Sequence, residues 1–317
     1  MELNPINTSN KVDNKIRVLI LGGNGFIGKH VVSKALDLEW QVTSIGLNLL
    51  NKRADQAKNV IYKAADMTNP VQLRKALGSA KFEYVINCAG YIDHTLFSKS
   101  GRKIVESHFM GLVNLVELLD RSVLRSFINL GSSDEYGNID APQAESQREE
   151  PNSPYSMGKV ASTHFLQMLY RTEDFPATTL RLFLTYGPWQ GGDRFIPQMI
   201  SGCLKDSKFP VSKGEQIRDF CFIEDVVNAI FLVFNTPKSH GEVINIASGI
   251  PISIKKVIET VQDLTGGGHP NFGAVPYRPK ENMSLYADIN KASTLLNWQP
   301  AVSLDEGLFR TMQWLKV

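Results

Sequence analysis

Tyr155, Lys159 and Ser132 have the side-chain types and spacing needed for proton transfer at a carbonyl or alcohol. Tyr155 and Lys159 are four residues apart in "YSMGK", so a helix would place both on one face. A lysine ammonium favours the phenolate and is expected to lower the tyrosine pKa, so that the phenol exchanges a proton near neutral pH. In "GSSDEYG", Ser132 supplies a hydroxyl for a substrate oxygen. The expected catalytic set is Ser132, Tyr155 and Lys159, with Ser133 as a substrate contact.

A glycine-rich stretch near the N-terminus has the spacing of a phosphate-binding turn. In "VLILGGNGFIGKHVVSKAL", an apolar run leads into Gly22, Gly25 and Gly28, and a helical pattern follows. Glycine permits a tight turn, close approach of a pyrophosphate, and close packing of a helix whose N-terminus attracts phosphate. An ordinary glycine-rich turn is the alternative, but its place at the head of an alternating series favours a dinucleotide. The expected cofactor contacts here are Gly22, Gly25, Phe26, Ile27 and Gly28.

The end of the second predicted strand, "QVTSIG", bears on which dinucleotide is bound. NAD usually meets an Asp or Glu there, which accepts from the ribose 2′-hydroxyl. Gly46 occupies that position, and Lys52 and Arg53 follow shortly after it. A missing carboxylate with nearby cations suits a 2′-phosphate, so NADP(H) is favoured; NAD(H), with both cations solvated in a loop, is the alternative. Further expected cofactor contacts are Asp66, as an acceptor for the adenine amine, Met67 and Ala89.

Strand-like and helix-like segments alternate through the first half of the chain and must position these residues. Strands are expected at 17–22, 41–46, 60–66, 84–90, 126–133 and 177–187, and helices at 26–38, 70–77, 101–122 and 155–172. This alternation predicts an α/β fold with a Rossmann-type doubly wound parallel sheet. A smaller α/β C-terminal substrate domain is expected to follow. The predicted division is 15–183 plus about 220–246 for the cofactor domain, and about 184–219 and 247–317 for the substrate domain.

The composition argues against several classes of function. A net charge of +2 over 317 residues provides no excess of positive charge for nucleic acid or a membrane surface. No apolar run approaches the ~20 residues of a membrane-spanning helix, and the polar N-terminus lacks the apolar core of a signal peptide. Cys88, Cys203 and Cys221 have no metal-ligand spacing. We therefore expect buried thiols in a reducing, cytoplasmic protein with no metal site.

With these motifs in place, the chain resembles the extended short-chain dehydrogenases/reductases of the nucleotide-sugar epimerase/dehydratase group. The resemblance rests on "GGNGFIG", "YxxxK", "GLVNLVELL", "LRLFLTYGP", "RFIP", "IRDFCFIEDV" and "ADINKASTLLNWQP", and it covers nearly all of residues 17–315. It implies a Rossmann domain that holds NAD(P) and a C-terminal domain that binds a nucleoside diphosphate-sugar.

The resemblance also implies roles for particular residues. Arg218 and Arg278 match family positions that contact the diphosphate, which suits charge-assisted bonds from arginine to phosphate. Arg194 lies in the loop that lines the nucleotide pocket in relatives. The helices at 101–122 and 155–172 correspond to those that form a four-helix bundle across a two-fold dimer, so a homodimer is expected.

Several departures from the family pattern bear on the reaction. Family dehydratases carry Thr-Asp-Glu or Thr-x-Glu where this chain has Ser132-Ser133-Asp134, and Glu135 falls where they keep an apolar residue. This weakens the dehydratase interpretation, and the loop looks closer to that of enzymes that reduce 4-keto-6-deoxy sugar nucleotides. Leu184 stands where many relatives place an asparagine that contacts the sugar diphosphate. His108 also replaces an asparagine, and a packed helix histidine is favoured over a catalytic one.

The expected reaction follows from the cofactor preference and this loop. NADPH would deliver hydride to C4 of a nucleoside diphosphate 4-keto-6-deoxy (or 3,6-dideoxy) hexose in deoxysugar or surface-polysaccharide biosynthesis. Tyr155 would protonate the alkoxide, Lys159 would bind the nicotinamide ribose, and Ser132 would orient the carbonyl. The alternatives are an NAD-dependent 4-epimerase or 4,6-dehydratase, and, outside enzymes, a catalytically silent relative that senses NADP(H).

Overall fold

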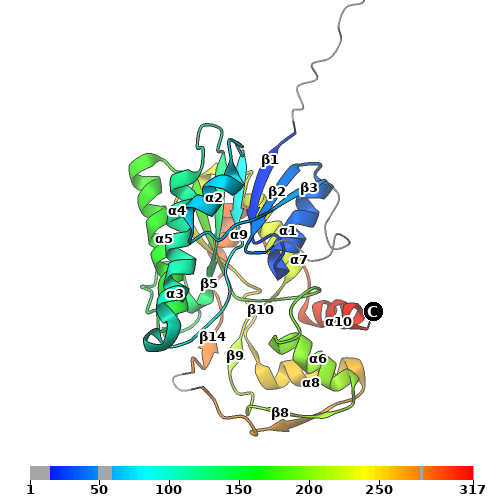
Figure 1. Cartoon of the computed structure of the whole chain (residues 1–317). Helices are drawn as coiled ribbons and strands as arrows, with labels where there is room; N and C mark the ends of the chain where they lie inside the picture. The colour runs from blue at the N-terminus through cyan, green and yellow to red at the C-terminus, as the bar shows by residue number, and fades with distance from the viewer. Residues whose placement is uncertain (1–14, 49–58, 279–280, 317) are drawn as a thin grey trace, which may run out of the picture.

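Seven parallel strands form the central sheet of this computed structural model, which describes residues 15–48, 59–278 and 281–316 (Figure 1). The strands are β1 (Arg17–Leu21), β2 (Gln41–Gly46), β3 (Val60–Ala64), β4 (Tyr84–Asn87), β5 (Ser126–Ser132), β6 (Ala177–Leu182) and β11 (Val243–Ile246). Their order across the sheet is β11-β6-β5-β4-β1-β2-β3, with β4 in the centre and β1 beside it. Val18, Leu19, Ile20 and Leu21 of β1 are fully buried, as a strand covered on both faces requires. The predicted Rossmann-type fold is confirmed.

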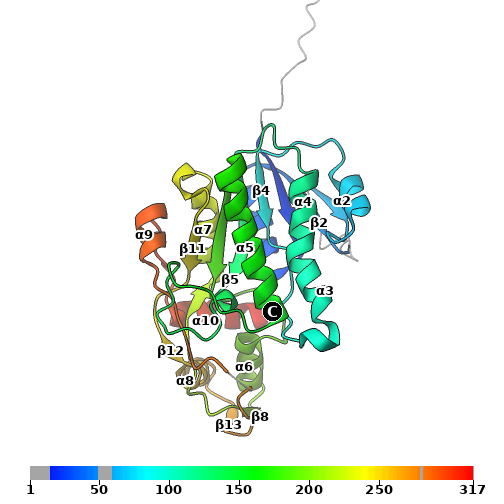
Figure 2. The same cartoon turned by 90° about the vertical axis from the view of Figure 1, so that its left-hand side faces the viewer.

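Helices cover both faces of the sheet and bury two separate hydrophobic clusters. One face carries α1 (Phe26–Asp37) and α7 (Ile223–Val233), and α9 (Asn290–Leu296) packs beside α7. The other face carries α2 (Pro70–Leu77), α4 (Gly111–Leu118) and α5 (Pro154–Glu173), which stand in front of the sheet in Figure 2. Right-handed crossovers between parallel strands require this two-sided arrangement.

The helix expected at 101–122 starts with one π-turn and is interrupted by a second. It consists of a π-turn η2 (Phe97–Gly101), α3 (Arg102–Val105), a second π-turn η3 (Glu106–Met110) and α4, which ends at Leu118. The carbonyl of His108, within η3, accepts a hydrogen bond from the Ser162 hydroxyl of α5 at 2.8 Å. A π-turn frees such a carbonyl from the regular helix ladder, and π-turns are frequent at functional sites.

The strand expected at 177–187 also breaks, at Phe183. β6 ends at Leu182, and β7 (Leu184–Tyr186) pairs in parallel with β10 (Phe220–Phe222) outside the main sheet. The backbone changes partners at this point: Phe183 N–H donates to the Ile246 carbonyl and Leu184 N–H to the Asp219 carbonyl, each at 3.1 Å. The sequence is continuously strand-like, but only this change of partner directs the chain out of the sheet.

A smaller α/β unit lies at the carboxyl ends of the sheet strands (Figure 1). Its helices are α6 (Phe195–Leu204), α8 (Ile254–Thr265) and α10 (Leu304–Leu315). Its strands form two small sheets, β8 (Lys208–Val211) with β13 (His269–Phe272), and β9 (Ile217–Arg218) between β12 (Ile252–Ser253) and β14 (Ser284–Leu285). Short 3₁₀ helices occur at η4 (Ser133–Tyr136) and η5 (Pro237–Ser239). The unit is formed by two segments of the chain, and α7 and β11 of the main domain lie between them in the sequence.

Candidate active site

The turn between β1 and α1 requires glycine at two positions. Gly22 has φ +74°, and a Cβ there would lie 2.9 Å from the Cα of Ala89. A Cβ on Gly28 would lie 2.1 Å from the Gly22 carbonyl oxygen, so only glycine lets α1 begin this close to the turn. Gly25 is the N-cap of α1 and has no side chain to accept from the first helical N–H groups. Those N–H groups therefore suit the pyrophosphate of a dinucleotide.

The end of β2 carries no carboxylate at the position that distinguishes the two dinucleotides. Gly46 is the last residue of β2, and the Asn24 side chain beside it donates to the Asn48 carbonyl at 3.1 Å. Lys52 and Arg53, the cations expected for a 2′-phosphate, lie outside the described residues.

The other expected cofactor contacts follow β3 and β4. Asp66 Oδ1 accepts from the backbone N–H and the hydroxyl of Thr68, both at 2.8 Å, and so closes its own turn. The Met67 carbonyl accepts from the Asn114 side chain at 2.9 Å. Ala89 is one of the residues that line the pocket described in the next paragraph, whereas Asp66 and Met67 are not.

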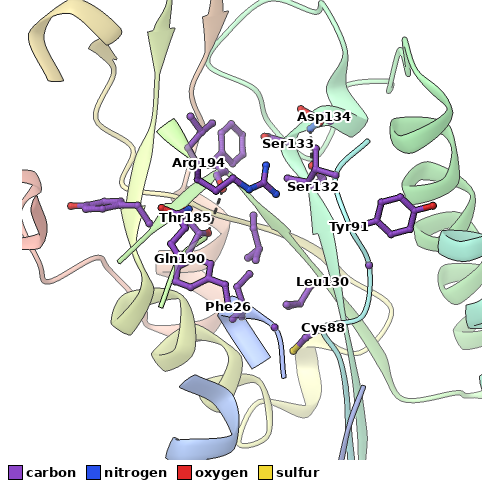
Figure 3. Close-up of a pocket in the computed structure, with 18 of the residues that line it drawn as sticks. Phe26, Cys88, Tyr91, Leu130, Ser132, Ser133, Asp134, Thr185, Gln190 and Arg194 are labelled. Atoms are coloured by element: carbon purple, nitrogen blue, oxygen red, sulfur yellow. Dashed lines mark hydrogen bonds between the residues drawn. The ribbon is translucent and has the colours of Figure 1, made fainter. Parts of the chain in front are cut away.

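A pocket of about 610 Å³ opens at the carboxyl ends of β1, β4, β5 and β6 (Figure 3). Ligands of doubly wound α/β folds bind at this edge. Its wall is built from the glycine turn, the chain after β4, the end of β5, the start of α5 and the segment after β6. The expected site residues that line it are Gly25, Phe26, Ile27, Gly28, Ala89, Ser132, Ser133, Tyr155, Lys159 and Arg194.

Two local structures bring the three expected catalytic side chains together. Ser132 ends β5; its hydroxyl oxygen accepts from the Asp134 N–H at 3.2 Å, and the hydroxyl also forms a hydrogen bond with Tyr155. Tyr155 and Lys159 lie on the first turns of α5, whose N-cap Ser153 accepts from the Ser156 N–H at 3.1 Å. All three catalytic candidates line the same pocket.

The sequence predicts that Lys159 lowers the pKa of Tyr155, but in the structure that pKa is raised. Burial raises the pKa of Tyr155, the charge of Asp134 adds to this, and a hydrogen bond with Ser132 acts in the opposite direction. The Lys159 ammonium donates to the Leu130 carbonyl at 2.7 Å and lies 6.0 Å from the centroid of the Tyr155 ring. The expectation of a lowered phenol pKa is therefore wrong here, because desolvation of the phenolate outweighs the nearby cation.

Sequence reasoning assigned no role to His94, which faces Asp134 across the pocket. His94 Nε2 lies 3.7 Å from Asp134 Oδ2, and the Asp134 side chain is 30% exposed. Burial raises the pKa of Asp134, whereas the charges of His94, Arg218 and Arg278 lower it. The acid after two serines was visible in the sequence, but no pattern connected it to a histidine 40 residues earlier.

His108 is a packed helix histidine, as expected, and its ring lies against that of Tyr155. Its Nε2 lies 2.9 Å from the Tyr91 carbonyl oxygen, and burial lowers its pKa to about 3. Gly90, with φ +141°, leaves room for the imidazole, since a Cβ there would lie 2.6 Å from the ring. The histidine is therefore neutral near pH 7.

The three arginines expected at the substrate differ in their placement. Arg194 precedes α6, is exposed and lines the pocket (Figure 3). Arg218, at the end of β9, is 9% exposed, and its Nη2 lies 2.5 Å from Glu281 Oε1. Arg278 is exposed and, like Arg218, is not part of the pocket wall. Leu184 stands in the wall, so an apolar side chain occupies the place of the family asparagine.

Among the residues that the structure describes, no helix is both long and apolar enough to cross a membrane. Nor do these residues contain a group of three or more His, Cys, Asp or Glu side chains that could hold a metal ion.

Comparison with known proteins identifies the family. The model of the NAD dependent epimerase/dehydratase family matches residues 18–247. A dTDP-glucose 4,6-dehydratase of Haemophilus influenzae is 25% identical, covering 94% of this chain and 97% of that protein. The structure of UDP-glucose 4-epimerase from Thermotoga maritima has a TM-score of 0.88 at 24% identity, covering 95% of this chain and 99% of that one. UDP-glucuronic acid 4-epimerase from Bacillus cereus, solved with UDP-glucuronic acid and NAD, has a TM-score of 0.83 at 28% identity and the same coverage. The chain belongs to the NAD-dependent epimerase/dehydratase family, whose relatives here act on nucleotide sugars.

Proposed function

We propose that the protein is a 4-epimerase of nucleoside diphosphate-hexoses that works with a tightly bound nicotinamide dinucleotide. The convergence of Ser132, Tyr155 and Lys159 on one pocket, beside a glycine turn suited to a pyrophosphate, carries this proposal. Relatives named as epimerases and dehydratases support the alternative stated from the sequence better than they support net reduction of a 4-keto sugar.

The pocket residues divide the C4 reaction among them. A nicotinamide dinucleotide bound at the glycine turn supplies a reversible hydride acceptor. Ser132 donates to O4 of the sugar, and Tyr155 in its phenolate form takes the O4 proton as the C4–H bond breaks. Lys159 is a buried cation 6.0 Å from the centroid of that ring, and its charge opposes, without outweighing, the burial that raises the Tyr155 pKa. Epimerisation would be complete once C4 regains its hydrogen on the opposite face and the Tyr155 phenol returns its proton to O4, so no outside reductant would be consumed.

Ser133 distinguishes epimerisation from dehydration. Elimination of water across C5 and C6 needs an acid for the leaving hydroxyl and a base for the C5 proton. By the family resemblance, Ser133 stands at the middle position of the dehydratase pattern Thr-Asp-Glu or Thr-x-Glu, and Asp134 stands in place of its Glu. A serine hydroxyl is too weak an acid to replace a carboxylic acid, which supports epimerisation.

The identity of the dinucleotide is a separate question. Gly46 removes the carboxylate that usually binds the ribose 2′-hydroxyl, which supports NADP(H). The family model is NAD dependent, which supports NAD(H). An NADP(H) preference stays a prediction, to be tested by measuring the affinity of both dinucleotides and identifying the one that purifies with the protein.

The decisive experiment offers UDP-, dTDP-, GDP- and CDP-hexoses without added cofactor and identifies products by NMR. A C4 epimer of one donor, with a dinucleotide released on denaturation, is the expected result. A 4-keto-6-deoxy product would favour the dehydratase. Consumption of NADPH only with 4-keto-6-deoxy donors would favour the reductase, and no turnover with retained NADP(H) would favour the silent relative.

The variant Asp134→Asn distinguishes a 4-epimerase from a 4,6-dehydratase. A 4-epimerase should keep most of its activity in this variant, because the C4 chemistry uses Ser132 and Tyr155. A dehydratase should lose turnover, since the base for the C5 proton is gone. Ser133→Ala is the matched control in the same loop.

We also propose a homodimer in which η3, α4 and α5 pack against their copies. These helices lie side by side on one face (Figure 2), and the side chains of Met110 and Met168 are exposed there. Light scattering should give twice the monomer mass, and Met168→Lys should reduce it. A monomer at micromolar concentration would contradict this assembly.

A further inference from the structure

Glu135 is a fully buried carboxylate directly behind the proposed catalytic serine. Its Oε1 accepts the backbone N–H of Ser132 at 2.9 Å. Its Oε2 accepts the Thr163 hydroxyl at 2.8 Å and Arg181 Nε at 2.9 Å. A charge removed from water in this way is stable only when paired and hydrogen-bonded, and Glu135 meets both conditions.

The three donors come from three different elements that build the site. Ser132 ends β5, Thr163 lies on α5 and Arg181 lies on β6. Thr163 follows Lys159 by four residues, so both lie on the same face of α5. Room for the carboxylate comes from Gly131, where a Cβ would lie 2.5 Å from Glu135 Oε1. One carboxylate thus ties the serine turn to the helix that carries Tyr155 and Lys159.

The charge of Glu135 also acts on the catalytic side chains. Burial lowers the pKa of Lys159, and Glu135 is the main group that raises it again. Glu135 likewise raises the pKa of Tyr155, although less than burial and Asp134 do. Lys159 is only 8% exposed, so a nearby carboxylate matters for keeping its amine charged.

Arg181 is the cation that pairs with the Glu135 carboxylate. It is fully buried, with Glu135 on one side and Glu149 on the other, and its guanidinium lies 4.6 Å from the centroid of the Tyr136 ring. Among the described residues, Glu149 forms ion pairs with Arg181 Nη2 and with the exposed His164. Glu135 and Glu149 therefore share one ion-pair partner, but only Glu135 contacts the catalytic turn.

A purely structural role would not require this arrangement. Glu135 closes the capping box of η4 with Ser132, and that cap needs only the bond from the Ser132 N–H. A buried ion pair can often be replaced by apolar side chains without loss of stability.

We propose that Glu135 is a positioning residue: its hydrogen bonds with Ser132 and Thr163 fix the serine turn against α5, and its charge acts on the Lys159 amine of that helix. This inference rests on the proposed C4 chemistry for its catalytic consequence. The electrostatic part, the effect on Lys159, exists with or without a substrate.

The test compares Glu135→Gln with Glu149→Gln. Both variants remove one carboxylate from Arg181, so both should lower the unfolding temperature. Only Glu135→Gln should lower kcat, by at least about tenfold at nearly unchanged KM, because it loosens the catalytic turn rather than the substrate subsite. It should also move the alkaline limb of the kcat profile down by about one pH unit, since a lost negative charge lowers the pKa of Lys159.

A measurement without substrate separates this inference from the function proposed above. Lysine labelled with ¹³C at Cε, assigned with Lys159→Met, reports the titration of the Lys159 amine by NMR. Glu135→Gln should shift that titration to lower pH, and Glu149→Gln should leave it within a few tenths of a unit. An unchanged Lys159 titration in Glu135→Gln would overturn the inference, even if the enzyme is active. A shifted titration in an inactive wild-type protein would instead uphold it and reject the proposed reaction.

Discussion

The imidazole of His108 lies edge-on against the phenol ring of Tyr155, with ring centroids 4.9 Å apart and planes at 82°. Aromatic pairs favour this geometry. Because the histidine comes from π-turn η3 and the tyrosine from α5, the contact joins two helices at the pocket. A neutral, buried imidazole at this point has a consequence for stability in acid.

We expect the free energy of unfolding to fall as the pH drops from about 6.5 toward 3, in part through His108. Its pKa is about 3 in the folded protein, against 6.5 ordinarily, so only the unfolded chain takes up this proton in that range. This group adds a slope of at most about 1.4 kcal/mol per pH unit. Urea unfolding at pH 7, 5.5 and 4.5 should show a shallower slope for His108→Asn than for the wild type. Parallel slopes would contradict the buried neutral state.

Tyr155→Phe should reduce kcat about 10²–10⁴-fold and leave dinucleotide binding intact, because it removes only the group that moves the O4 proton. Tyr136→Phe is a matched control. That tyrosine is also buried and donates to Asn245 at 2.7 Å, but it lies outside the pocket wall. It should cost about 1 kcal/mol of stability and little activity. Equal loss of kcat in both variants would remove Tyr155 from the mechanism.

Gly28→Ala should prevent dinucleotide binding and lower the unfolding temperature. The added Cβ would meet a backbone carbonyl at 2.1 Å, so α1 would have to move away from the turn. Gly192→Ala provides the comparison, since a Cβ there has no atom within 4 Å among the described residues. Fluorescence titration with NAD and NADP measures the effect, and normal affinity in Gly28→Ala would argue against the glycine turn as the phosphate site.

Arg218→Met should raise KM for the nucleotide sugar roughly 10–100-fold with a smaller change in kcat, if its guanidinium binds the diphosphate. Glu281 holds Arg218 in this structure, so Glu281→Gln frees the arginine and should leave KM similar or lower. Steady-state kinetics and inhibition by the free nucleoside diphosphate give both values. An unchanged KM in Arg218→Met would restrict this arginine to its ion pair with Glu281.

Local sequence patterns were reliable where short-range physics decides the structure. The helix predicted at 70–77 has the same first and last residues in the structure, because Asn69 caps it and Pro70 is its first residue. The alternation of apolar runs and amphipathic segments likewise predicted the sheet and its flanking helices. Patterns failed at Phe183 and around His108, where a change of hydrogen-bond partner in space interrupts a continuous local signal.

The sequence by itself determined the fold, the glycine turn and the residue types of the Ser132, Tyr155 and Lys159 set. These depend on periodicity, on glycine at fixed spacing and on motifs that are local in the chain. Only the tertiary structure decided how those side chains behave. It buries Tyr155 and so raises its pKa, directs the Lys159 amine to the Leu130 carbonyl, and places Glu135 beneath Ser132 against Arg181 from another strand. Desolvation and charge pairing depend on distances between segments far apart in sequence, and no local pattern encodes those distances.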